Sequence, residues 1–183
     1  MSSIGNKEID ARYITKKLLK TNAKSSVYLV TDKVLSRDLV IKKGRKDFNN
    51  ETNSLPREAS IMVSLDHPNL PKIYDVKEDE DFIYTIEEFI DGEDLRTLVG
   101  NEGPLDQDTV IKWGITLCNI MEYLHSKGII YRDMKPGNIM LTPTGNIKLI
   151  DFDTARNYKE GAGEDTTHLG TVGYAAPEQF ETK

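Results

Sequence analysis

The sequence predicts an α+β fold, in which a strand-rich N-terminal part is followed by a mainly helical part. Up to about residue 90, short apolar runs separated by polar turns dominate, with one helical segment among them. The longest helical pattern comes later, between about residues 106 and 126. The chain has 183 residues, of which 38% are hydrophobic and 30% charged, so it is long enough for one core or two small lobes.

Five strands and one helix are expected in the N-terminal part. The strand segments alternate apolar and polar residues or run between turn residues, and they are 13–19, 27–30, 38–42, 73–76 and 82–90. The polar stretch 44–53 predicts a loop. A helix is expected at 56–65, because Pro56 suits a first helical turn and apolar residues then recur at helical spacing.

Two helices are expected in the second part. The first covers 93–99 and ends at Gly100, and the second covers about 106–126 and ends at Gly128. Beyond them, a turn containing Pro and Gly joins two short strands, at 139–141 and 147–150.

The long helix is amphipathic. Its periodicity places five residues on one face, namely Val110, Gly114, Leu117, Met121 and Leu124. Ile111, Ile115 and Cys118 lie beside this face. Cys118 is the single cysteine of the sequence, so it cannot form a disulfide within the chain, and we expect it to be a small buried core residue.

Composition excludes some classes of function. The net charge of -6 disfavours a general nucleic-acid binder, so no nucleic-acid partner is expected. The first residues lack the apolar run of a signal peptide, and no apolar stretch approaches the ~20 residues of a membrane span. With a single cysteine the chain is compatible with a reducing compartment, and we expect a cytoplasmic location.

The most informative segment is Tyr131-Arg132-Asp133-Met134-Lys135-Pro136-Gly137-Asn138, which is followed by Asp151-Phe152-Asp153 and then by Ala176-Pro177-Glu178. This order resembles the catalytic loop, the metal-binding segment and the end of the activation segment of a eukaryotic-like Ser/Thr protein kinase of the bacterial type. The resemblance spans roughly 13–180. It implies a bilobal fold with an N-terminal extension at 1–12, an N-lobe at 13–90 and a partial C-lobe at 91–183, with ATP between the lobes.

The resemblance implies roles for four residues of the second part. Asp133 is the catalytic base that accepts a hydrogen bond from the substrate hydroxyl, and Lys135 neutralises the transferring phosphoryl group. Asn138 and Asp151 offer oxygen ligands to Mg²⁺. The alternatives from the residues alone are a loop-capping Asp and ordinary turn residues, since Asn and Asp are common in turns.

Two residues of the N-terminal part are implied to hold the nucleotide. Lys42 ends the apolar run Leu39-Val40-Ile41 and is implied to contact the inner phosphates, paired with Glu58. The alternative for Glu58 is a solvated helix residue. Lys43 competes with Lys42 for this role, but strand alternation points the two side chains to opposite faces of the sheet.

The glycine-rich loop of the family falls at 20–27, and here it lacks its glycines. Lys20, Asn22 and Ser25 occupy the three glycine positions, and Val27 occupies the valine position. Glycine allows backbone amides to approach phosphate closely. Two interpretations stay open, namely a nucleotide-binding loop with altered affinity or nucleotide choice and a plain hairpin turn without phosphate contact.

The adenosine moiety is implied to bind backbone groups of Glu88 and Ile90, with Asp94 at the ribose. The same alignment places Glu87 at the back of the adenine pocket, where an apolar residue is more usual. A buried carboxylate is costly without a partner. Glu87 is therefore expected to be hydrogen-bonded, unless the alignment is displaced by one residue.

Two segments near the metal ligands depart from the family. Asp153 replaces a glycine and adds negative charge near the metals, and Tyr131 replaces a histidine as a packing residue. Arg132 is retained and could bind a phosphorylated residue of the activation segment. Thr166 and Thr167 are candidate phosphorylation sites, with solvated threonines as the alternative, and Thr171 resembles the threonine that contacts Asp133 and Lys135.

The resemblance implies an ATP-dependent and Mg²⁺-dependent kinase that phosphorylates Ser or Thr of a protein substrate. The alternative is a pseudokinase that binds nucleotide or acts as a scaffold, and segment 170–178 disfavours a small-molecule phosphotransferase. The family has further helices after Ala-Pro-Glu, whereas this sequence stops at Lys183. We therefore expect either a fragment or a form that covers exposed apolar surface by association with a partner or with itself.

Overall fold

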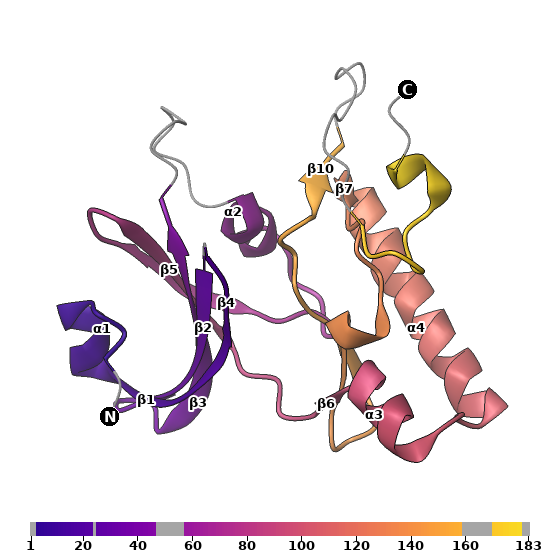
Figure 1. Ribbon diagram of the computed structural model, residues 1–183, viewed down its shortest axis with the longest axis horizontal. Coiled ribbons are helices and arrows are strands. Elements are labelled where there is room, and N and C mark those ends of the chain that lie inside the picture. The colour runs from indigo at the N-terminus through magenta and orange to yellow at the C-terminus, as the bar shows by residue number, and fades with distance from the viewer. Residues whose placement is uncertain (1–2, 24, 47–56, 159–169, 181–183) are drawn as a thin grey trace. The chain divides into compact units, whose positions relative to one another are not determined.

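The computed structural model describes residues 3–23, 25–46, 57–158 and 170–180 (Figure 1). The chain forms two compact units. The first comprises Met1–Val63 and Pro71–Phe89, and the second comprises Ser64–Leu70 and Ile90–Lys183.

The first unit contains a five-stranded antiparallel sheet with the strand order β1-β2-β3-β5-β4. The strands are β1 (Tyr13–Thr21), β2 (Ser25–Asp32), β3 (Arg37–Arg45), β4 (Ile73–Glu78) and β5 (Phe82–Glu88). This sheet confirms the five predicted strands. Because β3 extends through Gly44 to Arg45, it covers the first residues of the predicted loop 44–53, and residues 47–53 lie outside the described part.

Two helices accompany the sheet. Helix α2 (Arg57–Val63) is the predicted helix, although Pro56 lies outside the described residues. Helix α1 (Lys7–Arg12) was not expected; its N-cap residue Asn6 accepts the backbone N–H groups of Glu8 and Ile9. Figure 1 shows α1 beside the sheet.

The core of the first unit includes residues that precede the first strand. Ile4 and Ile9 are 2% and 0% exposed. They pack with one face of the sheet, represented by Val30, Leu39, Ile41, Tyr84 and Ile86. Residues 3–12 are therefore part of the packed unit.

The second unit is built from two helices and short strands. Its main elements are β6 (Glu93–Asp94), α3 (Leu95–Glu102), α4 (Gln107–Ser126), β7 (Ile129–Ile130), β8 (Ile139–Leu141), β9 (Ile147–Leu149) and β10 (Arg156–Asn157). Two 3-10 helices, η1 (Pro136–Asn138) and η2 (Pro177–Gln179), are added. Strand β8 lies between β6 and β9, and β7 pairs with β10.

The short helix was predicted at 93–99 and lies further along the chain. It begins at Leu95, because the carboxylate of Asp94 accepts the backbone N–H of Thr97 and caps the helix. It then continues through Gly100 to Glu102. Gly103, with φ 81°, ends it, since a left-handed conformation suits glycine at this position.

Helix α4 matches its predicted range and packs against β7 and β9. Its buried residues are Trp113, Ile120 and Leu124, of which only Leu124 belongs to the predicted face. The predicted face was wrong at Val110, which is 51% exposed. Cys118 is also exposed, so its prediction as a buried core residue was wrong.

Residues 64–70 belong to the second unit through specific hydrogen bonds. The side-chain amide of Asn69 donates to the carbonyl of Ile147 at 2.7 Å, and the Leu149 N–H donates to the carbonyl of Asn69 at 2.9 Å. The ring of His67 lies 5.0 Å from that of Tyr123. These contacts hold the segment against β9 and α4.

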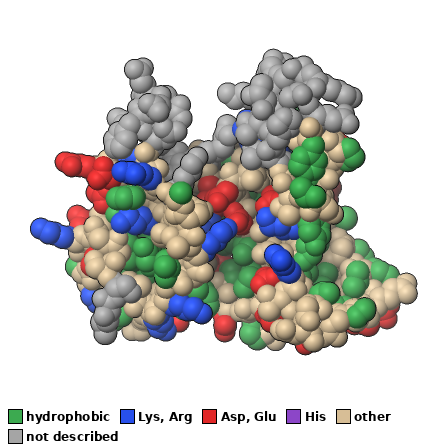
Figure 2. All heavy atoms as spheres, in the orientation of Figure 1, with side chains coloured by type: hydrophobic (Ala, Val, Ile, Leu, Met, Phe, Trp, Pro, Cys, Tyr) green, Lys and Arg blue, Asp and Glu red, His purple; other side chains and the backbone are tan. Residues whose placement is uncertain are grey.

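On the face shown in Figure 2, the basic side chains of each unit are interspersed with acidic and apolar ones. No continuous basic patch forms among the described residues on that face, in agreement with the acidic composition. Across the described ranges, no helix combines the length and apolar character that crossing a membrane requires.

Candidate active site

Asp133 is the centre of a hydrogen-bonded cluster in the second unit. Its Oδ2 accepts a hydrogen bond from the ammonium of Lys135 at 2.6 Å, and its Oδ1 accepts one from the hydroxyl of Thr171 at 2.7 Å. Lys135 also donates to the Thr171 hydroxyl at 3.0 Å. The structure therefore brings together Asp133 and Lys135, the two residues predicted to be catalytic, with Thr171, which the resemblance implied would contact both.

The cluster keeps the Asp133 carboxyl ionised. Burial by itself would raise the pKa of this carboxyl, but the hydrogen bonds from Lys135, Thr171 and Asn138 and the charge of Lys135 hold the pKa below its usual value. An ionised carboxylate can orient a hydroxyl group and accept its proton.

Asn138 connects the catalytic loop to the next strand. It is 4% exposed, and its side-chain nitrogen donates to Asp133 Oδ2 at 3.1 Å and to the Asp133 carbonyl at 3.0 Å. The Ile150 N–H donates to the Asn138 carbonyl at 2.8 Å. Because the amide nitrogen is used in this way, the amide oxygen is the atom that remains for a metal ion.

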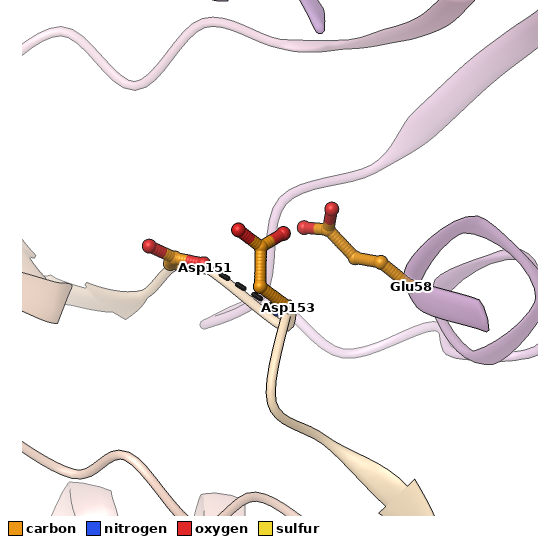
Figure 3. Close-up of side chains that lie close together, drawn as sticks. All are labelled: Glu58, Asp151 and Asp153. Atoms are coloured by element: carbon orange, nitrogen blue, oxygen red, sulfur yellow. Dashed lines mark hydrogen bonds between the residues drawn. The ribbon is translucent and has the colours of Figure 1, made fainter. Parts of the chain in front are cut away.

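Asp151 follows directly after Ile150 and has φ 66°, an uncommon value for a residue other than glycine. Its Oδ1 accepts the backbone N–H of Asp153 at 3.4 Å (Figure 3). The two carboxylates approach within 4.8 Å. A tight turn thus holds the carboxylates of Asp151 and Asp153 close together. Figure 3 also draws Glu58, which belongs to helix α2 of the first unit.

Tyr131 and Arg132 support the catalytic loop. Tyr131 is 2% exposed, donates its hydroxyl to the Ile150 carbonyl at 2.5 Å and packs edge-on against Phe152. Its prediction as a packing residue agrees with these contacts. Arg132, with φ 69°, donates through Nε and Nη2 to the Thr154 carbonyl at 2.8 and 2.7 Å. Thr166 and Thr167, the candidate phosphorylation sites, lie outside the described residues.

In the first unit, Lys42 lies against two carboxylates. Its ammonium donates to Glu58 Oε1, and it is 3.5 Å from Glu87 Oε2. Lys43 points to the other face, where it donates to the Ile4 carbonyl at 2.7 Å and lies 4.1 Å from the centre of the Phe82 ring. The predicted separation of the two lysines by strand alternation is therefore seen in the structure.

The β1–β2 hairpin carries the four residues at the expected glycine-rich loop. The Asn22 side-chain oxygen accepts the Ser25 N–H at 2.8 Å, and the Asn22 N–H donates to the Ser25 carbonyl at 2.9 Å. Val27 pairs with Lys20 on one side and with Lys42 on the other. The hairpin turn is thus closed by its own polar groups, and Val27 shares a cross-strand row with Lys42.

Of the three residues assigned to adenosine, Glu88 ends β5, Ile90 follows it outside any strand or helix, and Asp94 ends β6 and caps α3. The Glu88 N–H donates to the Lys72 carbonyl at 2.8 Å, and Ile90 is 8% exposed. The carboxylate of Asp94 also accepts the hydroxyl of Thr97 at 2.7 Å. Burial alone would raise the pKa of Asp94, but the bonds from Thr97 and the nearby backbone N–H groups lower it. Its function as a helix cap was missed from the sequence, although an Asp followed by a helical run is a recognisable signal.

Two further contacts of the site residues were not predicted from the sequence. Glu87 was expected to need a partner, but its proximity to Lys42 was not predicted. Strand alternation could have indicated it, since Lys42 lies opposite Thr85, two residues from Glu87 on the same strand face. The second contact, from the Gln179 side chain to the Arg132 carbonyl at 2.9 Å, had no local signal.

A small pocket of about 150 Å³ lies beside the cluster, within the second unit. Its lining includes Asp133, Thr171, Tyr174 and Gln179, with Met121 contributed by α4. Asp133 therefore lies at the wall of a cavity that is also lined by the aromatic residue Tyr174.

Comparison with known proteins identifies the family that the sequence matches. The family model of the protein kinase domain matches residues 13–183. The chain is 33% identical over 177 residues to the serine/threonine-protein kinase PrkC of Bacillus subtilis, covering 94% of this chain and 27% of the relative. It is 33% identical over 178 residues to the serine/threonine-protein kinase PknB of Mycobacterium tuberculosis, and the match covers 92% of this chain and 28% of that relative. It is 36% identical over 173 residues to a probable PknB of Lactococcus lactis, again covering 92% and 28%. The chain thus spans little more than a quarter of the length of these relatives.

Proposed function

Because this chain belongs to the protein kinase family, we propose that it transfers the γ-phosphoryl group of ATP to a serine or threonine hydroxyl of a protein substrate. The observation that supports this most strongly is the cluster in which Lys135, Thr171 and Asn138 all donate to Asp133. Each of these groups has a task in phosphoryl transfer, and all four belong to one unit.

Asp133 would act as the base. Its ionised carboxylate accepts a hydrogen bond from the substrate hydroxyl and orients the oxygen toward the γ-phosphorus. It takes the proton as the new P–O bond forms and the bond from the γ-phosphorus to the bridging oxygen breaks, so that ADP leaves with that oxygen. Lys135 would neutralise negative charge on the transferring group. Thr171 bonds both residues and would fix their relative position.

Asn138 and Asp151 would hold Mg²⁺. An amide oxygen and a carboxylate are the hard ligands that magnesium prefers, so the residues fit the ion. Bound Mg²⁺ would supply positive charge that neutralises the phosphate oxygens of ATP. Asp153, whose carboxylate lies close to that of Asp151, adds negative charge at the same turn.

We assign the remaining nucleotide contacts residue by residue, as the family resemblance implies. Lys42 would bind the inner phosphates with Glu58 as its partner, and the hairpin residues Lys20, Asn22, Ser25 and Val27 would lie over the nucleotide. Backbone groups of Glu88 and Ile90 would bind adenine, and Asp94 would bind the ribose. A cytoplasmic location, where Mg-ATP is supplied, fits this function.

The test is intact mass spectrometry of the chain after incubation with Mg-ATP, beside its Asp133→Asn variant. We expect phosphoryl additions on the parent, and a reduction of at least about 10²-fold in the variant, because the base is lost. Equal phosphorylation of the two chains would contradict the assignment of the base. A parent that binds Mg-ATP but gains no phosphate would favour the pseudokinase alternative, for which the missing glycines of the hairpin are the supporting observation.

We also infer that the second unit can associate with another copy of the chain. The supporting observation is a set of exposed apolar side chains on α4, namely Val110, Ile111 and Ile115, which are 51%, 50% and 59% exposed. Grouped apolar side chains on a surface favour association, because burying them removes apolar area from water.

A further inference from the structure

The first unit contains a buried acidic residue, Glu87, that the proposed transfer reaction does not use. Its side chain is 5% exposed, against 15% for Glu58 and 22% for Lys42. A carboxylate at this depth is unfavourable unless charge and hydrogen bonds compensate for the lost water. The question is therefore what Glu87 binds.

Two groups bind the Glu87 carboxylate. Its Oε1 accepts the hydroxyl of Thr85 at 2.7 Å, and its Oε2 lies 3.5 Å from the ammonium of Lys42. The two oxygens thus face different partners. The Thr85 hydroxyl sets the orientation of the carboxylate, and the Lys42 ammonium supplies the opposite charge.

The sheet explains why these groups meet. In the antiparallel pairing of β3 with β5, Lys42 lies opposite Thr85 and Val40 lies opposite Glu87. Side chains alternate along a strand, so all four share one face, while Ile41 and Ile86 point to the opposite face and its core. The proximity of Glu87 to Lys42 is therefore a consequence of strand register.

The two carboxylates that contact Lys42 differ in how they are held. Glu87 lies on β5, which is hydrogen-bonded to β3 on one side and to β4 on the other. Glu58 lies on the seven-residue helix α2. Glu87 is therefore fixed to the same sheet as Lys42, whereas Glu58 reaches Lys42 from a separate element.

We propose that Glu87 is a positioning residue that holds the Lys42 ammonium jointly with Glu58. One ammonium carries three N–H donors and can serve both carboxylates. Lys42 then keeps a sheet-bound partner when its contact with Glu58 is lost, so its position depends less on helix α2. The consequence for phosphoryl transfer rests on the proposed function, whereas the ion-pair arrangement itself does not.

The experiment measures the reactivity of Lys42 toward acetic anhydride as a function of pH, with mass spectrometry of the peptide that contains it. The neutral amine reacts, and a neighbouring carboxylate favours the charged form. We expect the pH midpoint of labelling to fall by about one unit in Glu87→Gln and also in Glu58→Gln, and to fall further in the double variant. This readout needs no catalytic turnover.

The matched control is Glu78→Gln, because Glu78 is a carboxylate of the same sheet that pairs with Lys46 and has a side chain that is 69% exposed. It should leave the Lys42 midpoint unchanged. A second variant, Thr85→Val, keeps the Glu87 charge but removes the hydroxyl that orients it, and should give a smaller downward shift. Melting temperatures of all variants verify that each chain is folded.

The outcomes separate the two proposals. A Lys42 midpoint in folded Glu87→Gln equal to that of the parent would overturn the positioning assignment, whatever the activity. A shifted midpoint in a chain without transferase activity would support the assignment while removing the proposed function. In an active chain, Glu58→Gln should reduce kcat/KM for ATP at least about tenfold more in the Glu87→Gln background than in the parent, because additivity fails for groups that share a partner.

Discussion

At the scale of single residues, the candidate site depends on short hydrogen bonds to ionised groups. The Asp133 carboxylate accepts hydrogen bonds from three side chains, and two of the donors, Lys135 and Asn138, lie within five residues of it along the chain. Thr171 is 38 residues away and is the exception. Local loop geometry brings Asp133, Lys135 and Asn138 together, but hydrogen bonds among them were not predicted. The contact of Thr171 with Asp133 and Lys135 was expected, and only from the family resemblance.

The Thr171 hydroxyl should affect the pH dependence of the reaction. In Thr171→Val the hydrogen bond to the ionised carboxylate is lost, so the pKa of Asp133 should rise toward its usual value. We expect the acid limb of the kcat/KM profile to move to higher pH. The profile of Thr144→Val, a change in an exposed turn, should coincide with that of the parent; a Thr171→Val profile that also coincides would contradict the proposed coupling.

Asp151 should determine how strongly nucleotide binding depends on magnesium. Asp151→Asn removes a carboxylate ligand, so we expect the affinity for ATP in the presence of Mg²⁺ to fall about tenfold, with little change in its absence. Titration calorimetry with and without Mg²⁺ measures both values. Asp108→Asn on the exposed side of α4 is the control, and an unchanged magnesium dependence in Asp151→Asn would argue against its role as a ligand.

At the scale of elements, the N-terminal segment is attached to the β4–β5 turn by one carboxylate. Asp79 accepts the side chain of Asn6 at 3.0 Å and the hydroxyl of Tyr84 at 2.7 Å. Burial would raise the pKa of Asp79, but these bonds and the backbone N–H groups of Phe82 and Asp81 lower it to about 2. The ionised form is therefore the one that holds the segment.

Asp79→Asn should destabilise the first unit in a pH-dependent way. A carboxyl whose folded pKa of about 2 lies below its usual value of 3.8 stabilises the fold above about pH 4, and this stabilisation is lost as the pH falls toward 2. We expect the free energy of unfolding to drop by about 1–2 kcal/mol at pH 7 and by less at pH 3, after allowance for partial exposure.

Urea unfolding at the two pH values tests this expectation. Asp81→Asn serves as the control, because Asp81 lies in the same turn with an exposed side chain. An equal loss of stability at pH 7 and pH 3 would show that the Asp79 charge does not contribute.

At the scale of the whole molecule, charge and apolar surface have separate consequences. The net charge of -6 opposes association, whereas the exposed apolar side chains of Val110, Ile111 and Ile115 on α4 favour it. Ile115→Gln should lower the tendency of the chain to self-associate, measured by sedimentation at several concentrations.

The control for this comparison is Thr116→Gln, which lies about 100° round the helix from Ile115. It should leave the concentration dependence unaltered. If Ile115→Gln and the parent sediment alike at every concentration, this face of α4 does not mediate association.

The sequence alone determined the order of the five strands along the chain, the range of the long helix, the opposite directions of Lys42 and Lys43, and the residues of the catalytic loop. These features depend on local spacing, since strand and helix periods and short loop contacts act between residues near in sequence. The tertiary structure decided which face of α4 is buried, how Ile9 joins the core, and which side chain compensates Glu87. Each of these depends on the surface that packs opposite, and the partners on that surface come from parts of the chain that no local pattern connects.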